Sequence, residues 1–157
     1  MPILPNSTMQ TFKLHSRGTG VCQEIQQEGS AHVMKVDAAP VFGGKDKSPS
    51  PIAYALGGLI SCSQVTAQLV AKDFGIKLHS FEFDLTADFD TAILVGGTTE
   101  GNPNFQNVKV NVIVETDATD DVFKKFYEET ERRCPLYQLF ARSGAKINYY
   151  WSIRTDN

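Results

Sequence analysis

A long apolar segment that starts at Ile52 constrains the fold of this chain more than any other feature of the sequence. Apolar residues recur near helical spacing from Ile52 to Val70, and polar side chains are rare before Gln64. A helix that is apolar on nearly all sides requires burial. We therefore expect a long central helix with the rest of the chain packed around it.

The ends of this helix carry recognisable signals. Ser50 is a suitable N-cap with Pro51 at the first helical position, and Gly75 is a suitable C-cap. Gly57 and Gly58 would destabilise a solvated helix near its middle. In a buried helix they allow a neighbouring segment to approach the backbone closely.

Strands and further helices account for the other segments. One helix is expected to begin at Asp120 and to be interrupted by Pro135, and a shorter helix is expected to end at Gly144. Residues 91–106 are expected to form a long connection. Turns are expected at residues 17–20 and 27–30. The predicted strands are Thr11–Leu14, Val21–Gln26, His32–Val36, Phe81–Leu85, Val108–Val114 and Ile147–Ile153. Segregated strands and helices favour an α+β fold, which we expect to form one domain of residues 1–157.

Composition and charge exclude several classes of function. The net charge is -3 and the sequence pI is about 5.6, so we expect no nucleic-acid partner. No apolar run approaches the roughly 20 residues that span a bilayer, and the first ten residues do not resemble a secretion signal. We expect a cytoplasmic protein without membrane contact. The three histidines form no HxxH or HxxxH pair and no CxxC occurs, so no metal or other cofactor is expected.

The chain has three cysteines, Cys22, Cys62 and Cys134, which is too few and an odd number for a disulfide scaffold. Cys62 lies on the long helix. It is either a small buried hydrophobe or a reactive thiol, and the second reading requires a nearby cation, because burial alone raises a thiol pKa. Cys22 is either an apolar strand residue or a thiol close to Arg17.

Cys134 precedes Pro135, a position that disfavours helical conformation. Cys134 can therefore cap a helix that begins at Pro135, where a thiolate is favoured, and Arg132 and Arg133 add positive charge nearby. A cysteine that fills the corner between two helices is the alternative. Arg17, flanked by Gly18, is either a solvated turn residue or a cation that reaches an active site.

Two motifs stand out along the chain. The first is the stretch from Phe42 to Cys62, with its glycine-rich loop, a proline at the helix start and a cysteine on a helix of small residues. The second is Arg132-Arg133-Cys134-Pro135-Leu136-Tyr137. Together they resemble the OsmC/Ohr family, the osmotically inducible protein C and organic hydroperoxide resistance proteins. The order of strands and helices also fits, so the resemblance covers nearly the whole chain.

This resemblance implies an OsmC-like fold, with antiparallel sheets around a long central helix in an intertwined homodimer whose active sites lie at the subunit interface. It also implies a thiol-dependent peroxidase that acts in oxidative stress. Cys62 would attack a hydroperoxide and become a sulfenic acid, and Cys134 would condense with it to a disulfide. An external dithiol, such as a lipoyl group, would then restore both thiols.

The sequence departs from the family pattern at two places. The family's helix glutamate, which holds an arginine against the first cysteine, is replaced by Ile52 or Ala53. The family's arginine aligns with Gly20, and Arg17, three residues earlier, is the candidate to replace it. A dimer that binds a small apolar ligand, or one with a structural role only, is therefore the alternative to a peroxidase.

Overall fold

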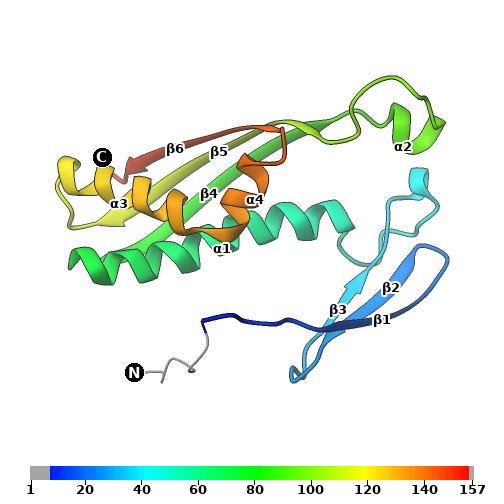
Figure 1. The fold of residues 1–157 in the computed structure, drawn as a ribbon, viewed down its shortest axis with the longest axis horizontal. Helices are drawn as coiled ribbons and strands as arrows, with labels where there is room; N and C mark the ends of the chain where they lie inside the picture. Colours follow the sequence, from blue (N-terminus) through cyan, green and yellow to red (C-terminus); the bar gives the residue numbers. More distant parts are fainter. Residues whose placement is uncertain (1–7, 156–157) are drawn as a thin grey trace. The chain divides into compact units, whose positions relative to one another are not determined.

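A computed structural model describes residues 8–155, in which the chain divides into two compact units between Tyr54 and Ala55. Each unit has its own sheet, and their helices and strands confirm the predicted α+β class (Figure 1). Among residues 8–155, no helix combines the length and apolar character that a membrane crossing requires.

The first unit is built on an antiparallel sheet with its strands in chain order. These strands are β1 (Leu14–Thr19), β2 (Cys22–Gln27) and β3 (Val33–Val36). The predicted strand at Thr11–Leu14 was wrong, because β1 begins where that prediction ends. The β2 and β3 predictions hold to within a residue at each end.

The predicted turn at residues 17–20 was also wrong. β1 continues through Arg17 to Thr19, and the chain reverses at Gly20 and Val21. Gly20 has a φ of 63°, which a two-residue hairpin turn favours. A Cβ at Gly18 would lie 2.6 Å from the Cys22 carbonyl oxygen, so this glycine permits close strand pairing rather than a turn.

Asp37 organises the loop that follows β3, which includes the 3₁₀ turn η1 (Pro40–Phe42). Its carboxylate accepts hydrogen bonds from the backbone N–H groups of Ala38 at 2.7 Å, Lys45 at 3.3 Å and Lys47 at 3.0 Å. These bonds lower the pKa of Asp37 to about 2, the largest contribution coming from the Lys47 N–H. One buried carboxylate thus closes a loop of ten residues.

The sheet of the second unit has the order β4-β5-β6, with β4 at Leu78–Phe89, β5 at Phe105–Thr116 and β6 at Lys146–Ile153. β4 and β5 are antiparallel, as predicted, and the short helix α2 (Ala92–Gly96) lies in their connection. β6 pairs with β5 in parallel, so the prediction of purely antiparallel sheets was wrong. The reason is that two helices connect β5 to β6, and such a crossover returns the chain in the same direction.

The helix α1 (Pro51–Phe74) contributes its first turn to the first unit and the remainder to the second. The Ala53 N–H donates to Ser50 Oγ at 3.1 Å, which confirms Ser50 as the N-cap. Burial on nearly all sides is not found in the single chain, because Val65 is 63% exposed and Leu69 is 51% exposed. The opposite face of α1 is buried against the sheet of the second unit.

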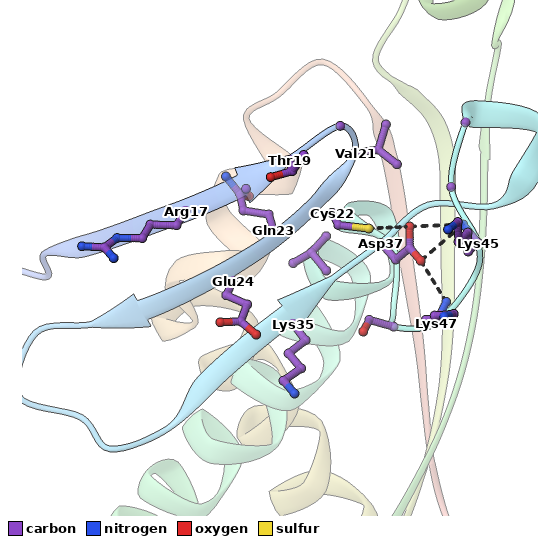
Figure 2. Close-up of a pocket in the computed structure, with 16 residues that line it drawn as sticks. Arg17, Thr19, Val21, Cys22, Gln23, Glu24, Lys35, Asp37, Lys45 and Lys47 are labelled. Atoms are coloured by element: carbon purple, nitrogen blue, oxygen red, sulfur yellow. Dashed lines mark hydrogen bonds between the residues drawn. The ribbon is translucent and has the colours of Figure 1, made fainter.

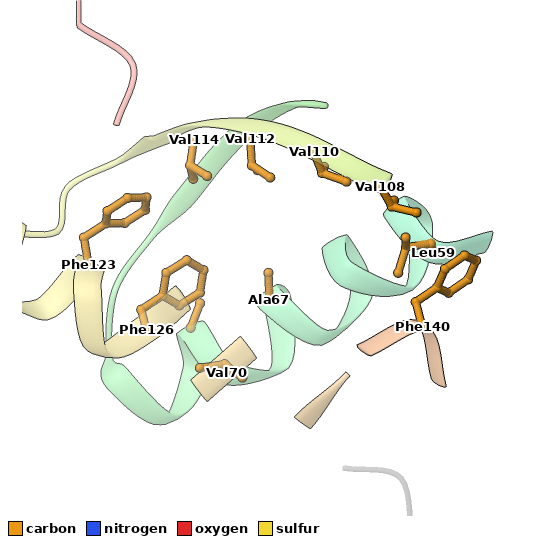
Figure 3. Packing of buried hydrophobic residues seen from close by; sticks show 11 residues of the cluster. Leu59, Ala67, Val70, Val108, Val110, Val112, Val114, Phe123, Phe126 and Phe140 are labelled. Atoms are coloured by element: carbon orange, nitrogen blue, oxygen red, sulfur yellow. The ribbon is translucent and has the colours of Figure 1, made fainter. Parts of the chain in front are cut away.

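The core of the second unit lies between α1 and the sheet (Figure 3). β5 supplies alternate valines, which are all fully buried, and α1 faces them with Leu59, Ala67 and Val70. Phenylalanines from the later helices close the ends of this layer. The buried residues of these strands and helices are Val108, Val110, Val112, Val114, Phe123, Phe126 and Phe140.

The two later helices are α3 (Asp120–Arg133) and α4 (Pro135–Ala141). Thr119 caps α3 by accepting from the Val122 N–H at 3.5 Å. A single residue, Cys134, separates the helices in an extended conformation with a ψ of 115°. The expected interruption at Pro135 is therefore confirmed, and it places the Cys134 side chain at the corner between the two helices.

Candidate active site

The second unit brings the thiols of Cys62 and Cys134 together, although 71 residues separate them in the sequence. Cys62 lies on α1 and is partly exposed, whereas Cys134 is fully buried. The Cys134 thiol lies close enough to Cys62 to raise the pKa of the Cys62 thiol. Both are free cysteines in this structure. The fold therefore brings two reduced thiols from distant parts of the sequence into one site.

The pKa of the Cys62 thiol is raised, first by burial and then by the neighbouring Cys134. The Leu136 N–H and the Thr66 side chain act in the opposite direction by hydrogen bonding. None of these groups is a cation. The second unit therefore holds Cys62 as a neutral thiol, and a peroxidatic role requires a further group that stabilises the thiolate.

The Cys134 sulfur occupies the N-cap of α4 and accepts from the Tyr137 N–H at 3.4 Å. This contact confirms the capping role that the Cys-Pro sequence predicts. Ser63 on α1 approaches the same sulfur, with 3.9 Å between Oγ and Sγ. Two polar groups from separate elements thus face the Cys134 sulfur.

Close packing at Gly58 brings α4 against α1. A Cβ at this position would lie 3.3 Å from Leu136 Cδ1, which is tighter than ordinary packing. Leu136 also provides the N–H that bonds Cys62. The predicted close approach is therefore confirmed at Gly58, whereas nothing lies within 4 Å of a Cβ at Gly57.

A second group of polar and aromatic side chains surrounds Glu131, on the last turn of α3. The Trp151 Nε1–H donates to Glu131 Oε1 at 2.9 Å, and Tyr137 also hydrogen-bonds this carboxylate. Burial raises the pKa of Glu131, and burial together with Glu131 raises the pKa of Tyr137 to about 12. The Tyr137 and Tyr149 rings meet edge to face with centroids 5.0 Å apart.

Sequence reasoning did not identify Ser63, Glu131, Tyr137 or Tyr149 as part of this site. A signal was present at the last strand, where residues 147–153 alternate in character. In the structure Trp151 contacts Glu131 inside the unit, whereas Tyr150 is 54% exposed. The strand pattern indicates which face is buried, but it does not show which helix residues lie opposite.

Arg17 and Cys22 belong to the first unit, where both line a hollow of about 680 Å³ with Asp37, Lys45 and Lys47 (Figure 2). Arg17 lies opposite Glu24 in the register of β1 and β2, and its side chain is exposed. The Cys22 thiol donates to Asp37 Oδ1 at 3.5 Å. This bond is the main cause of a raised Cys22 pKa, so Cys22 is held as a thiol. Cys22 shares this hollow with Arg17, but its thiol contacts Asp37 and its strand partner is Thr19, so its closeness to Arg17 stays an open alternative.

Among the described residues, no group of three or more histidine, cysteine, aspartate or glutamate side chains is arranged to hold a metal ion. The expected replacement at the helix start is visible in the first turn of α1, where Ile52 and Ala53 are exposed apolar side chains. Neither can accept a hydrogen bond from a guanidinium. The role of Arg17 beside Cys62 stays a prediction.

A pair of neighbouring thiols, one buried and one partly exposed, on an α+β scaffold is the class of site that this structure defines. Residues 44–149 match the OsmC-like protein family, which is more than half of the chain. The chain therefore belongs to the OsmC-like protein family, as its two cysteine motifs predict. No curated protein has a significantly similar sequence.

Solved structures support the same fold. An OsmC-like protein from Mycoplasma pneumoniae has 20% identity and a TM-score of 0.77, with 93% of this chain and 99% of that chain covered. An organic hydroperoxide resistance protein from Elizabethkingia anophelis has 15% identity and a TM-score of 0.70, with 94% and 99% covered. A further organic hydroperoxide resistance protein, from Bacillus subtilis, has 16% identity and a TM-score of 0.60, with 91% and 98% covered.

Proposed function

We propose that this protein is a thiol-dependent peroxidase that reduces organic hydroperoxides in the cytoplasm. The observation that carries the proposal is that the Cys134 thiol lies near enough to Cys62 to raise its pKa. The Cys62 sulfur attacks the peroxide O–O bond, which yields a sulfenic acid and releases the alcohol. The Cys134 thiol displaces the hydroxyl as water, so that an S–S bond forms as the S–O bond breaks. An external dithiol then reduces the disulfide by exchange.

Apolar surroundings favour organic over inorganic peroxides. Leu136 of α4 packs on α1 at Gly58, one turn before Cys62. Leu139, also on α4, is 63% exposed. An alkyl chain on the peroxide would gain apolar contacts of this kind, which hydrogen peroxide cannot make. Two organic hydroperoxides of different chain length, compared with hydrogen peroxide, test this preference.

Single substitutions of the two cysteines separate their roles. We expect Cys62→Ser to abolish the consumption of cumene hydroperoxide with dihydrolipoamide as reductant, because the nucleophile is lost. Cys134→Ser should lose sustained turnover yet trap one sulfenic acid on Cys62, detected with a dimedone probe and mass spectrometry. Normal turnover by Cys62→Ser would falsify the proposal. Cys22→Ser is the matched control and should retain activity.

We assign thiolate stabilisation at Cys62 to Arg17, which lies three residues before the position, Gly20 here, where the family pattern has an arginine. Removing it by Arg17→Met should lower kcat/KM for the peroxide about 100-fold, as expected for the loss of a charged partner at a nucleophile. Lys13→Met, just before β1, is the control, since the Lys13 ammonium forms an exposed ion pair with Glu28. Equal activity of the two variants would remove Arg17 from the site.

A binding function is the second candidate, because two observations favour it. The Cys62 pKa is raised, and the first turn of α1 offers Ile52 and Ala53 where the family pattern has an acid. A protein of this kind would take a small apolar ligand at an interface between two copies. The pH dependence of Cys62 alkylation in a Cys22→Ser background distinguishes the candidates: reaction only at alkaline pH, with no sulfenic acid under peroxide, supports binding.

A further inference from the structure

A short series of hydroxyl groups leads from the Cys134 sulfur to β6. Ser63 Oγ lies 3.9 Å from Cys134 Sγ and 2.8 Å from the Tyr149 hydroxyl oxygen. Ser63 also donates to the Leu59 carbonyl at 2.9 Å, one turn earlier on α1. Ser63 is 1% exposed and Cys134 is fully buried, so water does not compete for these contacts.

The hydrogen atoms of this series can be assigned by counting donors. A serine hydroxyl has one hydrogen and two lone pairs. With its hydrogen on the Leu59 carbonyl, Ser63 accepts from Tyr149 and from the Cys134 thiol. Every polar group is then satisfied while Cys134 is neutral, and the thiol hydrogen has a defined direction.

The same groups suit a negatively charged sulfur after one rotation. The Ser63 hydroxyl can turn from the Leu59 carbonyl to Cys134, because that carbonyl keeps its ordinary hydrogen bond within α1. Tyr149 continues to donate to Ser63. Together with the Tyr137 N–H at 3.4 Å, the sulfur would then accept two hydrogen bonds.

Tyr149 is held in place by its neighbours. Its ring packs against Tyr137 with centroids 5.0 Å apart and against Trp151 at 6.0 Å. Burial raises the Tyr149 pKa, so its hydroxyl remains a donor across the range in which thiols ionise. The titratable groups around Cys134 are Cys62 from α1, Tyr137 from α4, Tyr149 from β6 and, beyond these, Glu131 from α3.

We propose that Ser63 and Tyr149 are positioning residues for Cys134, which direct its thiol and stabilise its sulfur as negative charge develops during attack on Cys62. The inference rests on the proposed function in treating Cys134 as the resolving thiol. In that step the S–S bond forms, the S–O bond of the sulfenic acid breaks, and the Cys134 proton leaves with the hydroxyl as water. Neither Ser63 nor Tyr149 is oxidised or consumed.

A peroxide-free reaction tests this role. In a Cys22→Ser background, one equivalent of 5,5′-dithiobis(2-nitrobenzoate) converts Cys62 to a mixed disulfide and releases one thionitrobenzoate. Attack by Cys134 on Cys62 then releases a second, which is followed at 412 nm in single turnover from pH 6 to 10. The leaving group is the same in every variant, so the pH profile of the second release reports the Cys134 thiol.

We expect Ser63→Ala and Tyr149→Phe to slow the second release about tenfold at pH 7 and to move its pH midpoint upward by about one unit, as the loss of a hydrogen bond to a charged group predicts. Ser61→Ala and Tyr127→Phe are the matched controls. Ser61 is an exposed residue of the same helix, and Tyr127 stacks on Trp151 in the same aromatic cluster. Both should stay within about twofold of the parent.

The outcomes are distinct. An unchanged pH midpoint in both Ser63→Ala and Tyr149→Phe, with near-ultraviolet circular dichroism like that of the parent, overturns the positioning role. Absence of a second release in the parent overturns it as well, since Cys134 would then not reach Cys62. A normal second release without peroxide consumption would instead contradict the proposed function and leave the positioning role supported.

Discussion

The side chains around the two cysteines give the two sulfurs different surroundings. Cys134 is enclosed, capped by the Tyr137 N–H and approached by Ser63. Cys62 is more accessible, and burial and Cys134 raise its pKa. Accessibility suits the thiol that meets substrate, and enclosure suits the one that meets only its partner. No cation is among the groups that shift the Cys62 pKa, so the proposed peroxidase activity requires a further group that stabilises the thiolate.

Asp37 offers a test of a single side chain in the first unit. Its pKa is lowered to about 2, so its hydrogen bonds stabilise the fold above the unfolded-state pKa of about 3.9. That contribution should fall as the pH drops from about 4 toward 2. Asp37→Asn should lower the melting temperature at pH 7, because the Lys47 N–H loses its carboxylate partner.

The difference in melting temperature between Asp37→Asn and the parent should shrink steadily between pH 4 and pH 2. Asp88→Asn, on the exposed end of β4, is the control and should show little difference at either pH. A gap between parent and Asp37→Asn that is constant across this range would mean that the lowered pKa is not what stabilises the loop.

Among the helices, α1 combines three properties that its sequence suggests separately. Its start is capped by Ser50, its middle admits Leu136 at Gly58, and one face covers the valines of β5. α3 and α4 are joined through Cys134, whose backbone leaves the helical conformation before Pro135. The thiol pair therefore depends on how closely α4 lies against α1.

The two adjacent glycines of α1 should respond differently to alanine. Gly57→Ala meets no atom within 4 Å and should stabilise the protein by about 0.5–1 kcal/mol through helix propensity. Gly58→Ala must displace Leu136 and should gain less or lose stability. Thermal unfolding measures both effects.

Gly58→Ala should also slow disulfide formation between Cys62 and Cys134, because Leu136 lies beside both cysteines in the fold. Gly57→Ala serves as the control for that rate. Equal rates in the two variants would show that the contact between α4 and α1 at Gly58 does not set the geometry of the thiols.

For the complete chain, the exposed side of α1 is the feature that a single copy leaves unexplained. Val65 and Leu69 are 63% and 51% exposed on a helix whose sequence predicts burial on nearly all sides. We propose that a second copy of the chain covers them, in the homodimer that the family resemblance implies. Burial of such side chains would contribute about 1.5–3 kcal/mol each.

Charged substitutions on this face test the dimer. Analytical ultracentrifugation of the parent should give twice the chain mass of 17.3 kDa. The double variant Val65→Lys and Leu69→Lys should shift the protein to one chain mass, because two ammonium groups would have to be desolvated at the interface. Leu94→Lys, on α2, is the control for an exposed leucine elsewhere. A parent that sediments as a monomer would contradict the proposal.

Local features of the chain could be predicted from the sequence, because they depend on neighbouring residues. The caps at Ser50 and Cys134 follow from side-chain chemistry beside a proline, and the burial of β5 follows from alternating valines. The hairpin around Gly20 was misplaced, because Gly18 serves strand pairing there and resembles a turn residue in the sequence. A glycine can either form a turn or allow two strands to pair closely, and the sequence does not distinguish these two roles.

The sequence by itself determined the α+β class, the family and the identity of the two cysteines, since composition, periodicity and motif order are properties of the chain alone. Only the tertiary structure decided that β6 runs parallel to β5, that Cys134 lies near enough to Cys62 to raise its pKa, and that Ser63 links Cys134 to Tyr149 by hydrogen bonds. These contacts join α1, the α3–α4 corner and β6. Packing between elements sets such distances, and no local pattern records them.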